Sequence, residues 1–150
     1  MKENFDFLRK HNILVKKENS IFAEICKHYN MSYADINMLD AIYDRNKVTE
    51  PTILAEELLI PKQTVTSMVD KLEKSGYVKR LHNENDRRKV NIILLPEGEK
   101  LLLKVQKTID FAKKYITNHI GKKELEDMLE KYQKIITLLQ EAILQEVNND

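Results

Sequence analysis

Apolar side chains in the first thirty residues recur at the spacing of a helix. From about Asn4 to Tyr29 they stand three, four or seven residues apart, which predicts one long amphipathic helix. Ser32 then offers an N-cap oxygen with Asp35 three residues later, so a second, shorter helix is predicted to begin there and to end near Arg45. The positions of the two inward stripes are Leu8, Val15, Phe22, Ile25 and Tyr29, then Ile36, Leu39, Ile42 and Tyr43.

Two shorter helical patterns follow between Thr49 and Gly76. They are TILAEELL and KQTVTSMVDKLEKSG, and the brief link Leu59, Ile60, Pro61 separates them. Gly76 suits the position that ends the second helix. Two runs of β-forming residues, YVKRLH and KVNIILL, then flank a polar tip rich in Asn and Asp, and this pattern predicts a β-hairpin.

The C-terminal third predicts two more long helices. Pro96 suits a first helical position and helical spacing continues to about His119; after Gly121 the apolar residues approach a heptad repeat. Nothing in one chain of 150 residues obviously covers that repeat. We therefore expect residues 1–30 and 97–150 to form a helical dimerisation region around residues 31–96, with a two-fold axis relating two copies. A monomeric bundle that uses the same stripes internally is the alternative.

Composition narrows the class of protein. The apolar fraction of 42% supports a folded core, while the formal charge of +1 gives no general affinity for acidic polymers. The single cysteine, Cys26, cannot form an internal disulfide. No apolar run approaches the ~18 residues of a membrane span, and charges interrupt any apolar core of a signal peptide. The expectation is a cytoplasmic protein without a membrane partner.

The order of parts in residues 31–96 meets the demands of duplex DNA. The major groove admits one α-helix, whose first turn can offer polar side chains to base edges and backbone N–H groups to phosphates. Glutamine can bridge an adenine edge, threonine can meet a thymine methyl, and lysine can reach guanine or a phosphate. In the second short helix that turn contains Lys62, Gln63, Thr64, Thr66 and Ser67.

Positive charge is concentrated on the same region. Between Lys62 and Asn91 there are eight Lys or Arg residues against four Asp or Glu, whereas from Pro96 to Val147 the numbers are nine and nine. The excess of positive charge therefore lies on the predicted DNA-binding segment, residues 62–91, and not on the C-terminal helices. A solvated charged surface of no special purpose would look similar.

Two segments resemble the MarR family of winged-helix regulators. They are ILAEELLIPKQTVTSMVDKLEKSGYVKR and NENDRRKVNIILLPEGEKLL, which look like the family's helix-turn-helix, its Leu-Glu-x-x-Gly end, its Asp-Arg-Arg wing and the opening of the next helix. The resemblance implies a mainly α fold, a winged helix-turn-helix with long N- and C-terminal dimerisation helices. Its implied order is four helices, two strands and two helices, in agreement with the pattern of apolar residues.

The resemblance also implies roles for particular residues. Lys62, Gln63, Thr64, Thr66 and Ser67 would face the major groove, and Arg87 or Arg88 would enter the minor groove from a basic wing that includes Lys89. Asp86 would orient a wing arginine through a charge-assisted pair, or would simply be a turn residue of the hairpin.

Three positions depart from the family's usual residues. Leu59 stands where Gly is common, Pro61 where Ser or Thr is common, and Ser67 where a basic residue is common. Pro61 is benign because a first helical turn needs no N–H there. Leu59 would be strained if the turn demands a positive φ, and Ser67 removes an expected phosphate or base contact. The operator sequence is therefore open.

Other candidate sites are weaker. A crevice for a small aromatic or lipophilic anionic effector could be lined by His28, Tyr29, Tyr33 and Ile36, although each also suits a plain core position. Cys26 has no resolving cysteine, and the scattered histidines do not form a metal site, so no metal or cofactor is predicted. No nucleophile and base pairing or phosphate-binding glycine loop indicates an enzyme.

These observations together predict a sequence-specific transcriptional regulator that binds duplex DNA. It would act as a homodimer on a pseudo-palindromic operator, as a repressor that a small ligand relieves. Two alternatives stay open: a dimeric winged-helix module that docks protein without DNA binding, and a sensor that responds to a metal or to thiol oxidation.

Overall fold

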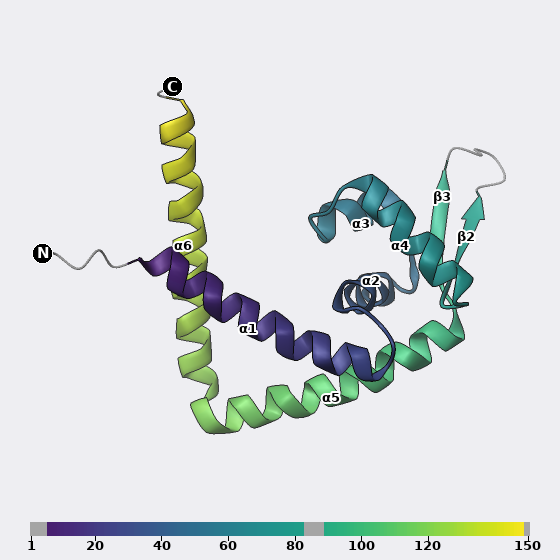
Figure 1. Ribbon diagram of the computed structural model, residues 1–150, viewed down its shortest axis with the longest axis horizontal. Coiled ribbons are helices and arrows are strands. Elements are labelled where there is room, and N and C mark those ends of the chain that lie inside the picture. Colours follow the sequence, from purple (N-terminus) through teal and green to yellow (C-terminus); the bar gives the residue numbers. More distant parts are fainter. Residues whose placement is uncertain (1–5, 83–88, 149–150) are drawn as a thin grey trace, which may run out of the picture. The chain divides into compact units, whose positions relative to one another are not determined.

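The computed structural model describes residues 6–82 and 89–148. It forms two compact units, and the boundary between Lys107 and Thr108 falls inside one long helix. The first unit contains α1 (Phe7–His28), α2 (Tyr33–Asp44), β1 (Val48–Thr49), α3 (Pro51–Glu57), α4 (Lys62–Lys74), β2 (Val78–His82), β3 (Val90–Leu94) and the start of α5 (Pro96–Ile120). The rest of α5 and α6 (Lys122–Val147) form the second unit (Figure 1).

The predicted fold class is confirmed, with one addition. The described strands form a three-stranded antiparallel sheet in the order β1-β3-β2, and β1, a strand of two residues, was not predicted. In this sheet Val78 of β2 pairs with Leu94 of β3, and Val48 of β1 pairs with Ile93 on the other side. The hairpin lies beside α4 (Figure 1), and β2 packs against this helix.

Local chemistry explains where the helices begin and end. The predicted cap of α2 is present in full: the amide of Asp35 donates to Ser32 Oγ, and the amide of Ser32 donates to the Asp35 carboxylate. Pro51 occupies the start of α3, where its missing N–H costs nothing. Gly76 follows α4 with φ +74°, a backbone conformation that suits glycine.

The core of the first unit lies between its helices and the sheet. Aliphatic side chains from α2, α3, α4, β2, β3 and α5 are almost fully excluded from solvent there. These residues are Met38, Leu39, Ile42, Leu54, Val65, Val69, Leu72, Val78, Ile92, Leu102 and Val105. Leu39, Ile42, Val65, Val69 and Leu72 follow the helical spacing of the sequence, whereas Met38 was not predicted to point inward.

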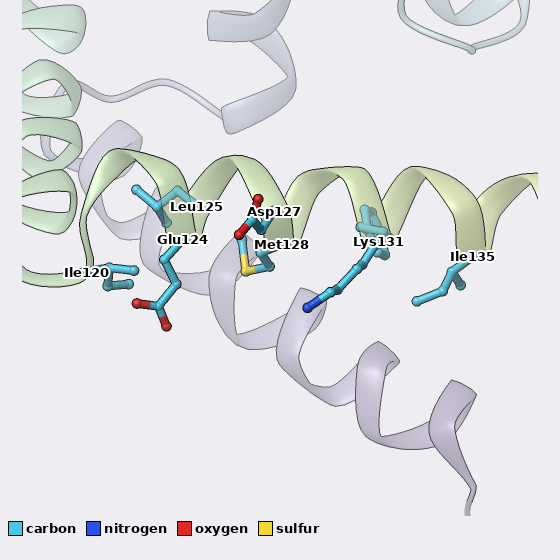
Figure 2. A pocket seen from close by; sticks show the side chains of 8 residues that line it. Ile120, Glu124, Leu125, Asp127, Met128, Lys131 and Ile135 are labelled. Atoms are coloured by element: carbon cyan, nitrogen blue, oxygen red, sulfur yellow. The ribbon is translucent and has the colours of Figure 1, made fainter.

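The second unit has a different character. No residue of α6 is buried, although the structure describes the whole of this helix. An open groove of about 460 Å³ runs along α6 from Ile120 past Leu125 and Met128 to Ile135 (Figure 2). Its lining is mostly apolar but includes the charged side chains of Glu124, Asp127 and Lys131. Such a mostly apolar face on a helix is typical of a surface that another protein covers.

No helix in the described part of the chain has the length and hydropathy that a membrane span would require. The predicted division at residues 30 and 97 between a dimerisation region and a DNA-binding region stays a prediction. The two units divide at a different position, because the first half of α5 packs Leu102 and Val105 into the core of the first unit.

Candidate nucleic-acid interface

The N-terminal half of α4 presents a row of polar side chains to solvent. Val65 and Val69 point into the core, and this packing turns the opposite face of the helix outward. The Thr66 hydroxyl donates to the Lys62 carbonyl at 3.1 Å, which leaves the lone pairs of its oxygen free to accept. The exposed residues of this row are the five that the sequence predicts for the major groove, Lys62, Gln63, Thr64, Thr66 and Ser67.

The first turn of α4 also offers backbone donors. Pro61 is the N-cap residue, and no described side chain caps this end. The first helical hydrogen bond runs from the amide of Val65 to the Pro61 carbonyl, so the three preceding amides have no partner within the helix. Unpaired amides at a helix N-terminus attract anions, because the helix dipole adds a partial positive charge there. The sequence predicts that a proline is tolerated at position 61, and its place at the N-cap agrees with this prediction.

The turn between α3 and α4 contains an unusual residue. Leu59 adopts φ +53°, and 90% of its surface is exposed. The amide of Leu59 donates to the Glu56 carbonyl at 3.3 Å and the amide of Ile60 donates to the Ala55 carbonyl at 3.1 Å. These two bonds define a Schellman motif, which usually places glycine at the left-handed position. The strain expected at Leu59 is therefore present in the backbone.

Arg80 on β2, the first strand of the hairpin, binds three groups of α4. Its guanidinium contacts the carboxylates of Asp70 at 2.6 Å and Glu73 at 2.7 Å, and it donates to the Thr66 carbonyl at 3.2 Å. The backbone N–H of Arg80 also donates to Glu73 at 2.8 Å, and together with the guanidinium this bond holds the pKa of Glu73 below its ordinary value. Arg80 and its acidic partners were not among the residues predicted from the sequence.

A second ion pair holds α4 from the side of α2. Lys71 Nζ donates to the carboxylate of Asp35, the residue that also completes the cap of α2. Only 2% of the surface of Asp35 is exposed. A hollow of about 560 Å³ opens beside this pair, and Gln63 and Ser67 of the polar row are among its lining residues. This pair was also missed, because 36 residues separate its members.

The tip of the hairpin is only partly described. Asp86, Arg87 and Arg88, the wing residues predicted to orient or contact DNA, lie outside the described residues. Lys89 is exposed just before β3 begins. The roles of these four residues stay predictions.

The residues of the predicted effector crevice occupy different environments. Ile36 is buried in the core, and Tyr33 stacks on Phe22 with ring centroids 5.2 Å apart. His28 is exposed and contacts the neighbouring Tyr29 ring edge-on. A crevice formed by these side chains stays a prediction.

Cys26 has the environment of an inert thiol. It is 1% exposed, and burial raises its pKa, which disfavours the reactive thiolate. Among the described residues no group of three His, Cys, Asp or Glu side chains is arranged to hold a metal ion. The environment of Cys26 does not favour a sensor based on thiol oxidation.

Comparison with known proteins shows which family the middle of the chain resembles. The model of the MarR family matches residues 31–90. The chain is 32% identical over 84 residues to the HTH-type transcriptional regulator PecS of Dickeya dadantii, covering 55% of this chain and 51% of PecS. It is 31% identical over 85 residues to the HTH-type transcriptional repressor YetL of Bacillus subtilis, covering 56% and 51%. The middle of the chain is therefore similar to the MarR family. Its match spans about half the length of these two relatives.

Similarity to solved structures extends beyond the segment that matches the family model. The transcriptional regulator BldR of Sulfolobus solfataricus is 26% identical with a TM-score of 0.68, covering 91% of this chain and 99% of BldR. A cysteine-to-serine mutant of Escherichia coli MarR, crystallised with operator DNA, is 21% identical with a TM-score of 0.77, covering 89% and 95%. At that identity the second likeness concerns the fold alone. The curated relatives of the chain are named as transcriptional regulators and not as enzymes.

Proposed function

We propose that this chain is a MarR-family regulator, which controls transcription by binding duplex DNA through α4 and the β2–β3 hairpin. The observation that supports this most directly is the first half of α4, where exposed polar side chains and uncapped backbone amides occur together. Polar side chains can distinguish base edges, while the amides can bind phosphate. A regulator of this kind would work in the cytoplasm, beside the chromosome.

The proposed active species is a homodimer. Exposed apolar side chains gather on α6 and on the second half of α5, where no residue is buried. A symmetric partner that covers them would give each dimer two copies of the proposed DNA-binding surface. Such a dimer would favour a pseudo-palindromic operator with half-sites about one helical turn apart. These side chains are Phe111, Tyr115, Ile116, Ile120, Met128, Leu129, Leu138, Ile143, Leu144 and Val147.

Repression relieved by a small aromatic or lipophilic anionic effector completes the proposal. Such a ligand weakens DNA binding only through its preference for an arrangement of the two DNA-binding surfaces that does not fit DNA. The relative YetL is named as a repressor, which supports this direction of regulation over activation.

The test is a fluorescence-anisotropy titration with duplexes from the gene's own upstream region and with scrambled duplexes, at two salt concentrations. We expect preferential binding of the upstream duplex that weakens steeply as salt rises, because each neutralised phosphate releases counterions. Gln63→Ala should reduce the preference by about tenfold, while Lys123→Ala, in the second unit, should leave it unchanged.

Arg88→Ala tests the wing in the same titration and should also weaken binding. An absence of duplex affinity at either salt concentration would refute the proposal and would favour a winged-helix module that docks protein. Size-exclusion chromatography with light scattering would check the dimer separately.

A further inference from the structure

We infer that Asp35 and Lys71 form a positioning pair that fixes the direction of α4. In this way the pair sets the base preference of the polar row on that helix, Lys62 to Ser67. The inference rests on the proposed DNA-binding function and adds to it two residues that do not belong to the polar row. Asp35 stands in the first turn of α2 and Lys71 in the C-terminal half of α4, so the pair joins two helices.

Asp35 is the fixed, buried member of the pair, whereas 57% of the Lys71 side chain is exposed. One carboxylate oxygen, Oδ2, accepts from Ser32 Oγ at 2.6 Å, from the Ser32 amide at 3.3 Å and from Lys71 Nζ. The first two donors belong to the cap of α2 and hold the carboxylate in a fixed orientation. A buried carboxylate is costly without a cation, so the ammonium group of Lys71 is held against the start of α2.

A second anchor acts on a different side of α4. Asp70 and Lys71 are consecutive, and successive residues of a helix point about 100° apart. Asp70 therefore turns toward Arg80 of the wing strand, while Lys71 turns toward Asp35 of α2. Arg80 also donates to the Thr66 carbonyl, so β2 holds α4 both at and beyond the polar row, whereas Lys71 holds it against α2.

The polar row lies far enough from the Asp35–Lys71 contact that a small tilt of α4 would displace it from the base edges. Gln63 lies eight residues before Lys71, or about 12 Å along the helix axis at about 1.5 Å per residue. A tilt of roughly 10° at the anchor moves the Gln63 end by about 2 Å. A hydrogen bond to a base edge does not survive that displacement. Flexible lysines still reach phosphates, so nonspecific affinity remains.

The experiment compares variants in the titration that tests the proposed function. Lys71→Met removes the ammonium group and keeps the aliphatic stem; Lys74→Met removes the same charge from the same helix and is the matched control. We expect Lys71→Met to lower the ratio of specific to nonspecific affinity about tenfold more than Lys74→Met does, with equal salt slopes. Lys71→Arg restores the ion pair and should keep the ratio within about twofold of the wild type.

A double variant tests the pair itself. Asp35→Asn keeps a capping oxygen but removes the charge, and if the two residues act only together, adding it to Lys71→Met should lower the ratio no further. Hydrogen exchange in the free protein gives a readout without DNA. Amides of residues 62–67 should exchange faster in Lys71→Met than in Lys74→Met.

Three outcomes overturn the inference. The first is that Lys71→Met and Lys74→Met give the same ratio and the same exchange. The second is that Lys71→Met weakens binding to both duplexes equally and reduces the salt slope by about one, as expected of a direct phosphate contact. The third is that the wild type prefers neither duplex. Only the third also refutes the proposed function, so the two failures are distinguishable.

Discussion

Replacing Leu59 by glycine should stabilise the protein, although it removes a large side chain. A residue with a Cβ in the left-handed region costs about 1–2 kcal/mol, which glycine does not incur. Glycine in turn makes the unfolded chain more flexible, at a cost of about 0.4–1 kcal/mol. Because Leu59 is 90% exposed, removing its side chain sacrifices little buried area. The midpoints of these two ranges give an expected net gain of about 0.8 kcal/mol in the free energy of unfolding.

Leu59→Ala is the matched control, because alanine keeps the Cβ and the left-handed strain at φ +53°. Its free energy of unfolding should lie close to that of the wild type. Thermal unfolding followed by circular dichroism at one fixed protein concentration measures both, and about 1 kcal/mol corresponds to about 2–4 °C in a chain of this size. Equal stabilities of the glycine and alanine variants would refute the argument from backbone strain. A marked loss of stability in the alanine variant would show that the Leu59 side chain makes contacts of its own.

Three further predictions concern other parts of the first unit. Gly98→Ala should destabilise the protein by about 2 kcal/mol, because a Cβ at Gly98 would lie 2.4 Å from the Tyr77 carbonyl oxygen; urea unfolding measures this, and a neutral result contradicts it. The bonds from Arg80 lower the pKa of Glu73, so their stabilisation is present above about pH 4.3 and is lost as the pH falls through the lower folded-state pKa. Unfolding free energies of the wild type and Glu73→Gln should therefore differ at pH 7 and converge in acid, and a gap independent of pH would exclude this origin. Burial raises the pKa of Cys26, so iodoacetamide should modify it at pH 8 far more slowly in the native protein than in urea; equal rates would contradict this.

Features with a local physical cause could be predicted from the sequence. Ser32 and Asp35 have the spacing of a capping box, and the structure contains both of its hydrogen bonds. The exposed row on α4 follows in the same way, because burial of Val65 and Val69 determines which side chains point outward. Strand β1 was missed because two residues cannot display an alternating pattern.

Features that depend on distant residues could not be predicted. Lys71 and Asp35 meet across 36 positions, and nothing in either neighbourhood specifies the other. The acidic pair Asp70 and Glu73 did carry a signal, since two carboxylates three residues apart on one helix face can receive a guanidinium. Only the packing of β2 against α4 identifies Arg80 as that partner.

The absence of any buried residue in α6 affects how the regulator would respond to its own abundance. If a second copy covers this helix, as proposed, part of the free energy that keeps it folded depends on protomer concentration. Dilution would then lower the concentration of dimers more steeply than the total concentration of chains, because each dimer forms from two chains. Control of the target gene would show a threshold in the number of copies per cell, and the groove on α6 would set the position of that threshold.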